Sequence, residues 1–128
     1  MTPFDFINSI SQNKKDLIRS ADDPVSAEKE YNAFLVNKGL SYFADTVFYA
    51  NEMNRYSDLS NKMQYDYLIN SIVSRKRFAK WIKSETDDNL ELVMQYFGFN
   101  AEKAKAALSI LSSSDIEMIK QKRKTGGV

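Results

Sequence analysis

The hydrophobic residues of this chain recur at the spacing of an amphipathic α-helix along most of its length. The segment from Ser60 to Val73 is a clear example, because its apolar residues fall on one face at ~100° per residue. These residues are Tyr65, Leu68, Ile69, Ile72 and Val73. Ser60 is a residue type that caps the first turn of a helix, so the pattern predicts a helix over residues 60–73.

The same periodicity, together with capping residues, predicts an all-α fold of six or seven short helices. Thr2 and Asp23 are expected to cap two helices that begin with proline, and Asn100 is expected to cap another. Ser114–Glu117 is a capping-box pattern at the start of the last helix. Gly39 and Gly98 are expected to end two helices in the left-handed conformation. The predicted helices cover about residues 2–21, 24–36, 41–54, 60–73, 87–97, 100–111 and 114–124. We expect a single compact domain over residues 1–128, with a frayed basic tail at about 120–128.

The predicted helix at residues 41–54 is rich in aromatic side chains. Tyr42, Phe43, Phe48 and Tyr49 lie nearly all round it. Either this helix is the most buried one of the fold, or one of its faces meets a partner. We favour burial in the core.

The segment Arg75–Lys83 holds five of the chain's 18 basic residues and its only tryptophan. If the preceding helix continued through it, Phe78 and Trp81 would point roughly 200° away from the apolar face. Lysine side chains would then fall on the buried face, where an unpaired ammonium group is costly. We therefore expect the chain to change direction between Ser74 and Arg77.

This basic segment has two compatible roles. Its aromatic residues would dock a short helix on the core, and its cations would bind phosphate groups or an acidic partner. We expect Trp81 to be mainly structural, and Arg77 and Lys80 to be exposed and mainly functional. Reversing the charges of these two should then leave the melting temperature nearly unchanged. The candidate DNA- or partner-binding residues are Arg75, Lys76, Arg77, Phe78, Lys80, Trp81 and Lys83.

Composition narrows the class of function. The chain has no histidine and no cysteine, which removes serine triads, thiolate chemistry and the usual zinc sites. It contains neither a phosphate-binding loop motif nor a dinucleotide-binding glycine motif. Asp22–Asp23 and Asp87–Asp88 are better explained as acids at helix starts than as metal ligands. We therefore expect no enzyme activity, no cofactor, no metal and no small-molecule substrate.

The sequence also gives no sign of membrane association. The first residues, Met1–Asp5, lack the basic region and long apolar run of a signal peptide. No stretch approaches the ~20 apolar residues that a membrane span requires. We therefore expect no membrane partner.

Several ordered blocks of the sequence resemble one family. The most specific is the Lys-Arg-aromatic-Xaa-Lys-Trp-Xaa-Lys run at Lys76–Lys83. The supporting blocks are Lys29–Asn37, Tyr49–Asn54, Tyr65–Leu68, Tyr96–Asn100 and Leu108–Leu111. Together they are similar to the small, non-ATPase subunit of the sliding-clamp loader of T-even-like tailed phages and their marine relatives.

The resemblance implies a replication accessory protein in the cytoplasm of an infected bacterium. In that family the small subunit joins an AAA+ ATPase subunit, and the assembly loads the sliding clamp on primer-template DNA. Carried over to this chain, the family's basic-aromatic motif falls on Lys76, Arg77, Phe78, Lys80, Trp81 and Lys83. A free-standing helical nucleic-acid-binding protein is the alternative, and a small enzyme or host-protein inhibitor is a third, weaker one.

The missing phosphate loop generates the first prediction, which is that the purified chain neither binds nor hydrolyses ATP. Isothermal titration calorimetry at micromolar protein is expected to show no saturable heat on addition of ATP. Saturable binding would contradict the prediction.

Overall fold

The computed structural model describes residues 1–77 and 88–126, and the regular secondary structure within these ranges is helical. The chain divides into two compact units, Met1–Lys80 and Trp81–Val128, and each is described by itself. In the part of the chain that is described, no helix is long and apolar enough to cross a bilayer.

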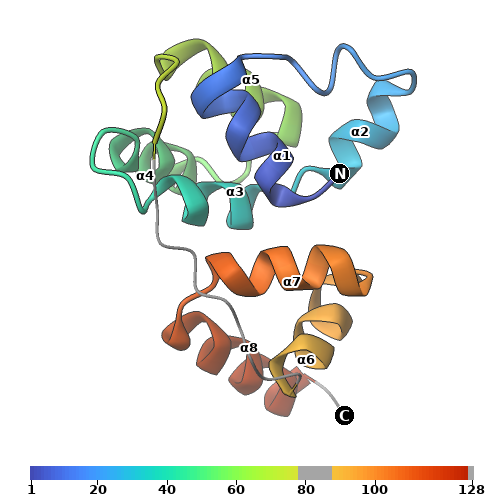
Figure 1. The fold of residues 1–128 in the computed structure, drawn as a ribbon. Helices are drawn as coiled ribbons and strands as arrows, with labels where there is room; N and C mark the ends of the chain where they lie inside the picture. Colours follow the sequence, from blue (N-terminus) through green and yellow to red (C-terminus); the bar gives the residue numbers. More distant parts are fainter. Residues whose placement is uncertain (78–87, 127–128) are drawn as a thin grey trace. The chain divides into compact units, whose positions relative to one another are not determined.

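The described part of the first unit, residues 1–77, contains five α-helices and a π-helical turn (Figure 1). They are α1 (Pro3–Asn8), the π-helical turn η1 (Ser9–Asn13), α2 (Pro24–Glu30), α3 (Ala33–Leu40), α4 (Val47–Arg55) and α5 (Asn61–Ser71). Helix α1 packs on α3, α3 packs on α4, and α5 packs on η1, α2 and α4. Helix α5 therefore joins the beginning of the unit to its later helices.

The second unit contains α6 (Asp88–Phe97), α7 (Ala101–Ile110) and α8 (Ser113–Gly126). Helix α6 packs on both α7 and α8. Gly98 has a φ of +71°, so it ends α6 in the left-handed conformation that the sequence predicted. Helix α8 extends to Gly126, within the range where we expected a frayed tail.

Side-chain caps fix most of the helix starts. The predicted caps Asp23, Ser60 and Asn100 accept hydrogen bonds from the amides of Ser26, Met63 and Lys103 at 3.3, 3.2 and 2.9 Å. The capping box of α8 lies two residues before the predicted one. Ser112 and Asp115 form it, with the Asp115 carboxylate accepting from the Ser112 amide at 2.9 Å and the Ser112 hydroxyl accepting from the Asp115 amide at 3.2 Å.

The prediction of six or seven helices was too low, since the described residues contain eight α-helices and η1. The predicted helix at 24–36 is two helices, because the Asn32 side chain accepts from the Leu35 amide at 3.0 Å and starts α3. The prediction that Gly39 ends a helix in the left-handed conformation was wrong. Gly39 lies inside α3, which continues to the buried Leu40.

Two further boundaries differ from the prediction. The first helical segment ends at Asn13 rather than near residue 21, although Ile18 is buried from the irregular segment that follows. The buried side chain of this irregular segment falls at a position that also fits helical periodicity, so the sequence pattern extended the helix too far. Helix α5 ends at Ser71, so the expected change of direction occurs a few residues before Ser74.

The aromatic helix is shorter and more exposed than predicted. Helix α4 begins at Val47, after Thr46 has donated its hydroxyl hydrogen to the Leu40 carbonyl at 2.6 Å. Ala50 and Met53 form its buried face, whereas the Phe48 ring points to solvent. The prediction that this helix is the most buried one was therefore wrong for the face that carries Phe48.

Three aromatic rings form the centre of the first unit. Phe6 meets Tyr31 and Tyr65 edge to face, at ring-centroid distances of 5.1 and 5.7 Å. All three side chains are buried, so these contacts add aromatic pairing to the burial of apolar surface. They tie α1 and α5 to the residue that follows α2.

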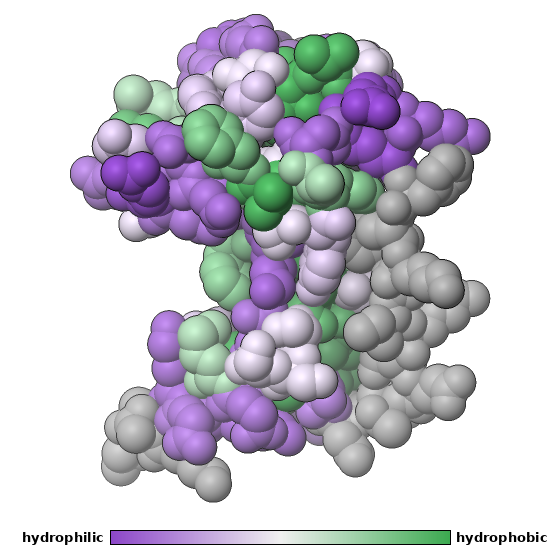
Figure 2. Space-filling model, turned by 90° about the vertical axis from the view of Figure 1, so that its left-hand side faces the viewer, coloured by the Kyte–Doolittle hydropathy of each residue, from purple (hydrophilic) through white to green (hydrophobic). Residues whose placement is uncertain are grey.

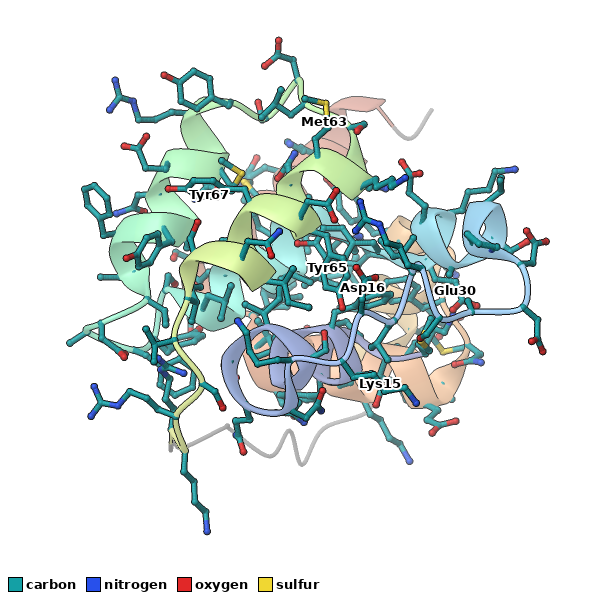
Figure 3. All side chains as sticks on the ribbon, turned by 90° about the horizontal axis from the view of Figure 1, so that it is seen from above. Lys15, Asp16, Glu30, Met63, Tyr65 and Tyr67 are labelled. Carbon is teal, nitrogen blue, oxygen red and sulfur yellow. The ribbon has the colours of Figure 1, made fainter. Side chains whose placement is uncertain are left out.

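The Tyr65 hydroxyl fixes the irregular segment that follows η1. It accepts from the Leu17 amide at 3.0 Å and lies 2.7 Å from the Ser9 hydroxyl and 3.2 Å from the Lys15 carbonyl oxygen. Figure 3 shows Tyr65 on the side of α5 that faces Lys15 and Asp16. A segment without regular secondary structure thus has its polar groups paired inside the unit.

Substitution of Tyr65 by Phe is expected to lower the free energy of unfolding by about 1–3 kcal/mol, because the Leu17 amide loses its acceptor. Tyr31→Phe is a matched control. The Tyr31 hydroxyl is also buried, but it has no hydrogen-bond partner among the described residues. Its removal should be neutral or stabilising. Urea denaturation of both variants checks the difference, and equal losses would contradict it.

Candidate nucleic-acid- and partner-binding segment

The described part of the basic segment, Arg75–Arg77, follows closely on the end of α5. Its main chain runs along the end of η1. The Ser74 hydroxyl donates to the Gln12 carbonyl, and the Arg75 amide donates to the Ser11 carbonyl at 3.0 Å. The start of the basic segment is therefore attached to the first helical segment of the chain.

Lys14 closes η1 and directs its ammonium group back onto the carbonyl end of that turn. It has a φ of 61°, in the left-handed region, and Nζ donates to the Ile10 carbonyl at 2.7 Å and to the Ile72 carbonyl. Partial burial, and then the nearby Arg77, lower the pKa of Lys14. A cation at this position satisfies carbonyl groups that a helix end leaves without partners.

The Arg77 guanidinium has an acceptor for each of its five N–H groups. Nε lies 3.1 and 3.0 Å from the two Asp45 carboxylate oxygens, and Nη2 lies 2.8 Å from one of them. Nη1 donates to the Ser11 and Arg75 carbonyls at 2.6 and 3.3 Å, and Nη2 donates to the Val73 carbonyl at 2.9 Å. Only 6% of the side chain is exposed. Arg77 therefore holds the segment in place.

Asp45, in the connection before α4, lies between two arginines of the segment. Hydrogen bonding from Arg77 holds its pKa below the ordinary value, with a smaller contribution from Arg75, whose Nη1 is 3.5 Å away. Because this pKa is lower in the folded than in the unfolded chain, the interaction stabilises the fold above pH ~4. That stabilisation is lost as the pH falls toward the lowered pKa.

Comparison with known proteins decides the family. The family model for the bacteriophage clamp loader A subunit matches residues 2–126. The chain belongs to this family. A curated relative, the sliding-clamp-loader small subunit of Enterobacteria phage T4, is 31% identical over 70 residues, which cover 54% of this chain and 37% of the relative. The match thus spans little more than a third of that relative's length.

In this member of the family the predicted site residues divide into three groups. Arg77 was expected to be exposed, and that expectation was wrong, because its side chain is paired with Asp45 and main-chain carbonyls. Arg75, with 64% of its side chain exposed, and Lys76 face solvent. The remaining candidates, Phe78, Lys80, Trp81 and Lys83, lie outside the described residues.

Three residues that position the segment were missed. Asp45 and Ser11 bond to the segment itself, and Lys14 bonds to the Ile72 carbonyl shortly before it. All three come from other parts of the chain, so these bonds leave no local pattern. Asp45 carried one usable signal, since it is the only acidic residue between Leu40 and Asn51. An isolated carboxylate in an aromatic stretch is a plausible partner for a nearby cation cluster.

Two arginines with the same neighbour provide a direct test. Arg77→Met should lower the free energy of unfolding by about 1.5–3 kcal/mol, because charge-assisted hydrogen bonds of a nearly buried group are removed. Arg75→Met removes one long ion pair of an exposed side chain, so its cost should stay below ~0.5 kcal/mol. Urea denaturation near pH 7 measures both, and a loss at Arg75 as large as at Arg77 would contradict the assignment.

Proposed function

We propose that this chain is a non-catalytic subunit of a phage sliding-clamp loader. It assembles with an AAA+ ATPase subunit, and the complex loads the sliding clamp on primer-template DNA in the cytoplasm of the infected bacterium. The observation that carries the proposal is the family match over residues 2–126. In this role the chain contributes binding surfaces and needs no cofactor of its own.

Within that role, Arg75 and Lys76 are proposed to contact DNA phosphates or an acidic surface of a partner. Both side chains are exposed, and Arg77 fixes the backbone that carries them. Exposed cations on a fixed backbone suit phosphate contacts, which depend on position more than on shape. Lys80 and Lys83 are proposed to add to the cations of the same basic segment, and Phe78 and Trp81 are proposed to position it.

A free-standing nucleic-acid-binding protein is the second candidate, because Arg75 and Lys76 could act without an ATPase. The two functions differ in what they require. A loader subunit should form a complex of fixed stoichiometry with the ATPase encoded by the same phage and raise its DNA-stimulated ATP turnover. A free-standing protein should bind DNA alone, with an affinity that falls steeply with salt.

The double variant Arg75→Glu/Lys76→Glu is expected to fold normally and to lose function. The complex with the ATPase should show at least a 10-fold loss of affinity for primer-template DNA or of assembly. The salt dependence of DNA binding should become shallower by about one unit of slope for each phosphate group that the variant no longer neutralises. Fluorescence anisotropy over a series of salt concentrations measures DNA binding, and calorimetry measures assembly.

Lys29→Glu/Lys62→Glu serves as the control, because it makes the same change in net charge at exposed lysines of α2 and α5. It should behave like the unaltered chain. If the Arg75/Lys76 variant also supports assembly, DNA binding and clamp loading at normal rates in moderate salt, these two cations are ordinary solvated surface.

A further inference from the structure

The outer sides of α4 and α5 expose large apolar side chains. Phe48, in the first turn of α4, is 64% exposed, and Met63, in the first turn of α5, is 56% exposed. Both helices bury other residues, including Ala50 and Leu68, so their inner faces are already packed. The exposed residues are therefore additional to what the core requires.

These side chains belong to one continuous surface. The Phe48 and Tyr49 rings meet edge to face at 5.7 Å, and Tyr49 meets the Tyr67 ring of α5 at 6.2 Å. Met63 lies one turn before Tyr67 on α5, which places the two side chains as neighbours. Figure 3 shows Tyr67 on the side of α5 toward α4. We name Phe48, Tyr49, Met63 and Tyr67 the aromatic strip.

Acidic residues of both helices are paired with arginines beside the strip. Glu52 of α4 lies 3.4 Å from Arg55, and Asp66 of α5 is bound by Arg19. Figure 2 shows hydrophobic side chains set among hydrophilic ones on the side of the first unit that it displays. A nucleic acid would need unpaired cations along its path, so this charge balance favours a neutral, apolar occupant.

The arrangement of the strip suggests the shape of that occupant. It follows the seam between two packed helices, and a third helix can lay a row of side chains along such a seam. Aromatic residues and methionine are enriched at the centres of protein interfaces, where they supply contact area. The tyrosine hydroxyls and the Glu52–Arg55 pair would lie at its polar edge.

We propose that the aromatic strip is a docking surface for the apolar face of an amphipathic helix in the ATPase subunit of the loader. The inference rests on the proposed function and adds to it the surface that makes the contact. It also accounts for the aromatic composition of α4, whose exposed face meets a partner in place of the core.

The test uses the full chain and the ATPase encoded by the same phage. Phe48→Ser/Met63→Ser should weaken assembly at least 10-fold by calorimetry and leave the melting temperature within a few degrees, because both side chains are exposed. Val25→Ser on α2 is the matched control, since Val25 is 66% exposed and lies off the strip. It should assemble normally.

Met63 should also be oxidised several-fold more slowly by peroxide in the complex than in the free chain.

Each other outcome counts against the proposal in an identifiable way. If the unaltered chain does not assemble with the ATPase, the proposed function fails and this inference with it. If the chain assembles and the double variant does so equally well, or Met63 is oxidised as fast in the complex, the strip alone is refuted. If the free chain dimerises through the strip, the occupant of the strip is a second copy of the chain. If the double variant loses only DNA affinity, the occupant is a nucleic acid.

Discussion

The carbonyl groups at the end of the first helical segment impose the constraint on which the basic segment depends. A helix leaves its last carbonyls without partners, and those of Ile10, Ser11 and Gln12 find donors outside it. Three donors to these carbonyls, from Ser74, Arg75 and Arg77, come from more than 60 positions later in the chain. If α5 continued through Arg75, the Arg75 amide would donate to a carbonyl within that helix. It donates instead to the Ser11 carbonyl, so the chain after α5 is extended.

This constraint separates two arginines that look alike in the sequence. The Arg77 guanidinium, a planar group with five donors, donates to the Ser11 carbonyl at the end of the first helical segment. Asp45 supplies the carboxylate that balances its charge. Arg75 shares the same carboxylate only through one longer ion pair. The number of basic residues in the segment is therefore larger than the number of positive charges that can bind a phosphate group. What remains for a partner depends on which cations the fold has already bound.

Sequence reasoning succeeded where the signal was local and failed where it was not. The caps at Asp23, Ser60 and Asn100 and the turn at Gly98 depend on residues within a few positions, and each was predicted. The irregular segment after η1 is fixed by Tyr65, about fifty positions later, so its buried Ile18 was assigned to a helix. The pairing of Arg77 with Asp45 is equally distant. Helical periodicity records which residues are apolar, but it does not say whether the core or a partner covers them, as Phe48 illustrates.

The basic segment and the aromatic strip are both connected to the start of α4. Asp45 precedes this helix and binds Arg77, and Phe48 lies in its first turn, so only two residues separate the anchor of one surface from the first side chain of the other. Over so short a span the backbone has little freedom to move them independently, because Thr46 between them is bonded to α3. On the functions proposed for these surfaces, a helix docked on the strip would fix the position of Arg75 and Lys76 relative to the ATPase. An accessory subunit without catalytic groups can influence its complex in this way, through the fixed distance between a surface that binds protein and one that binds phosphate.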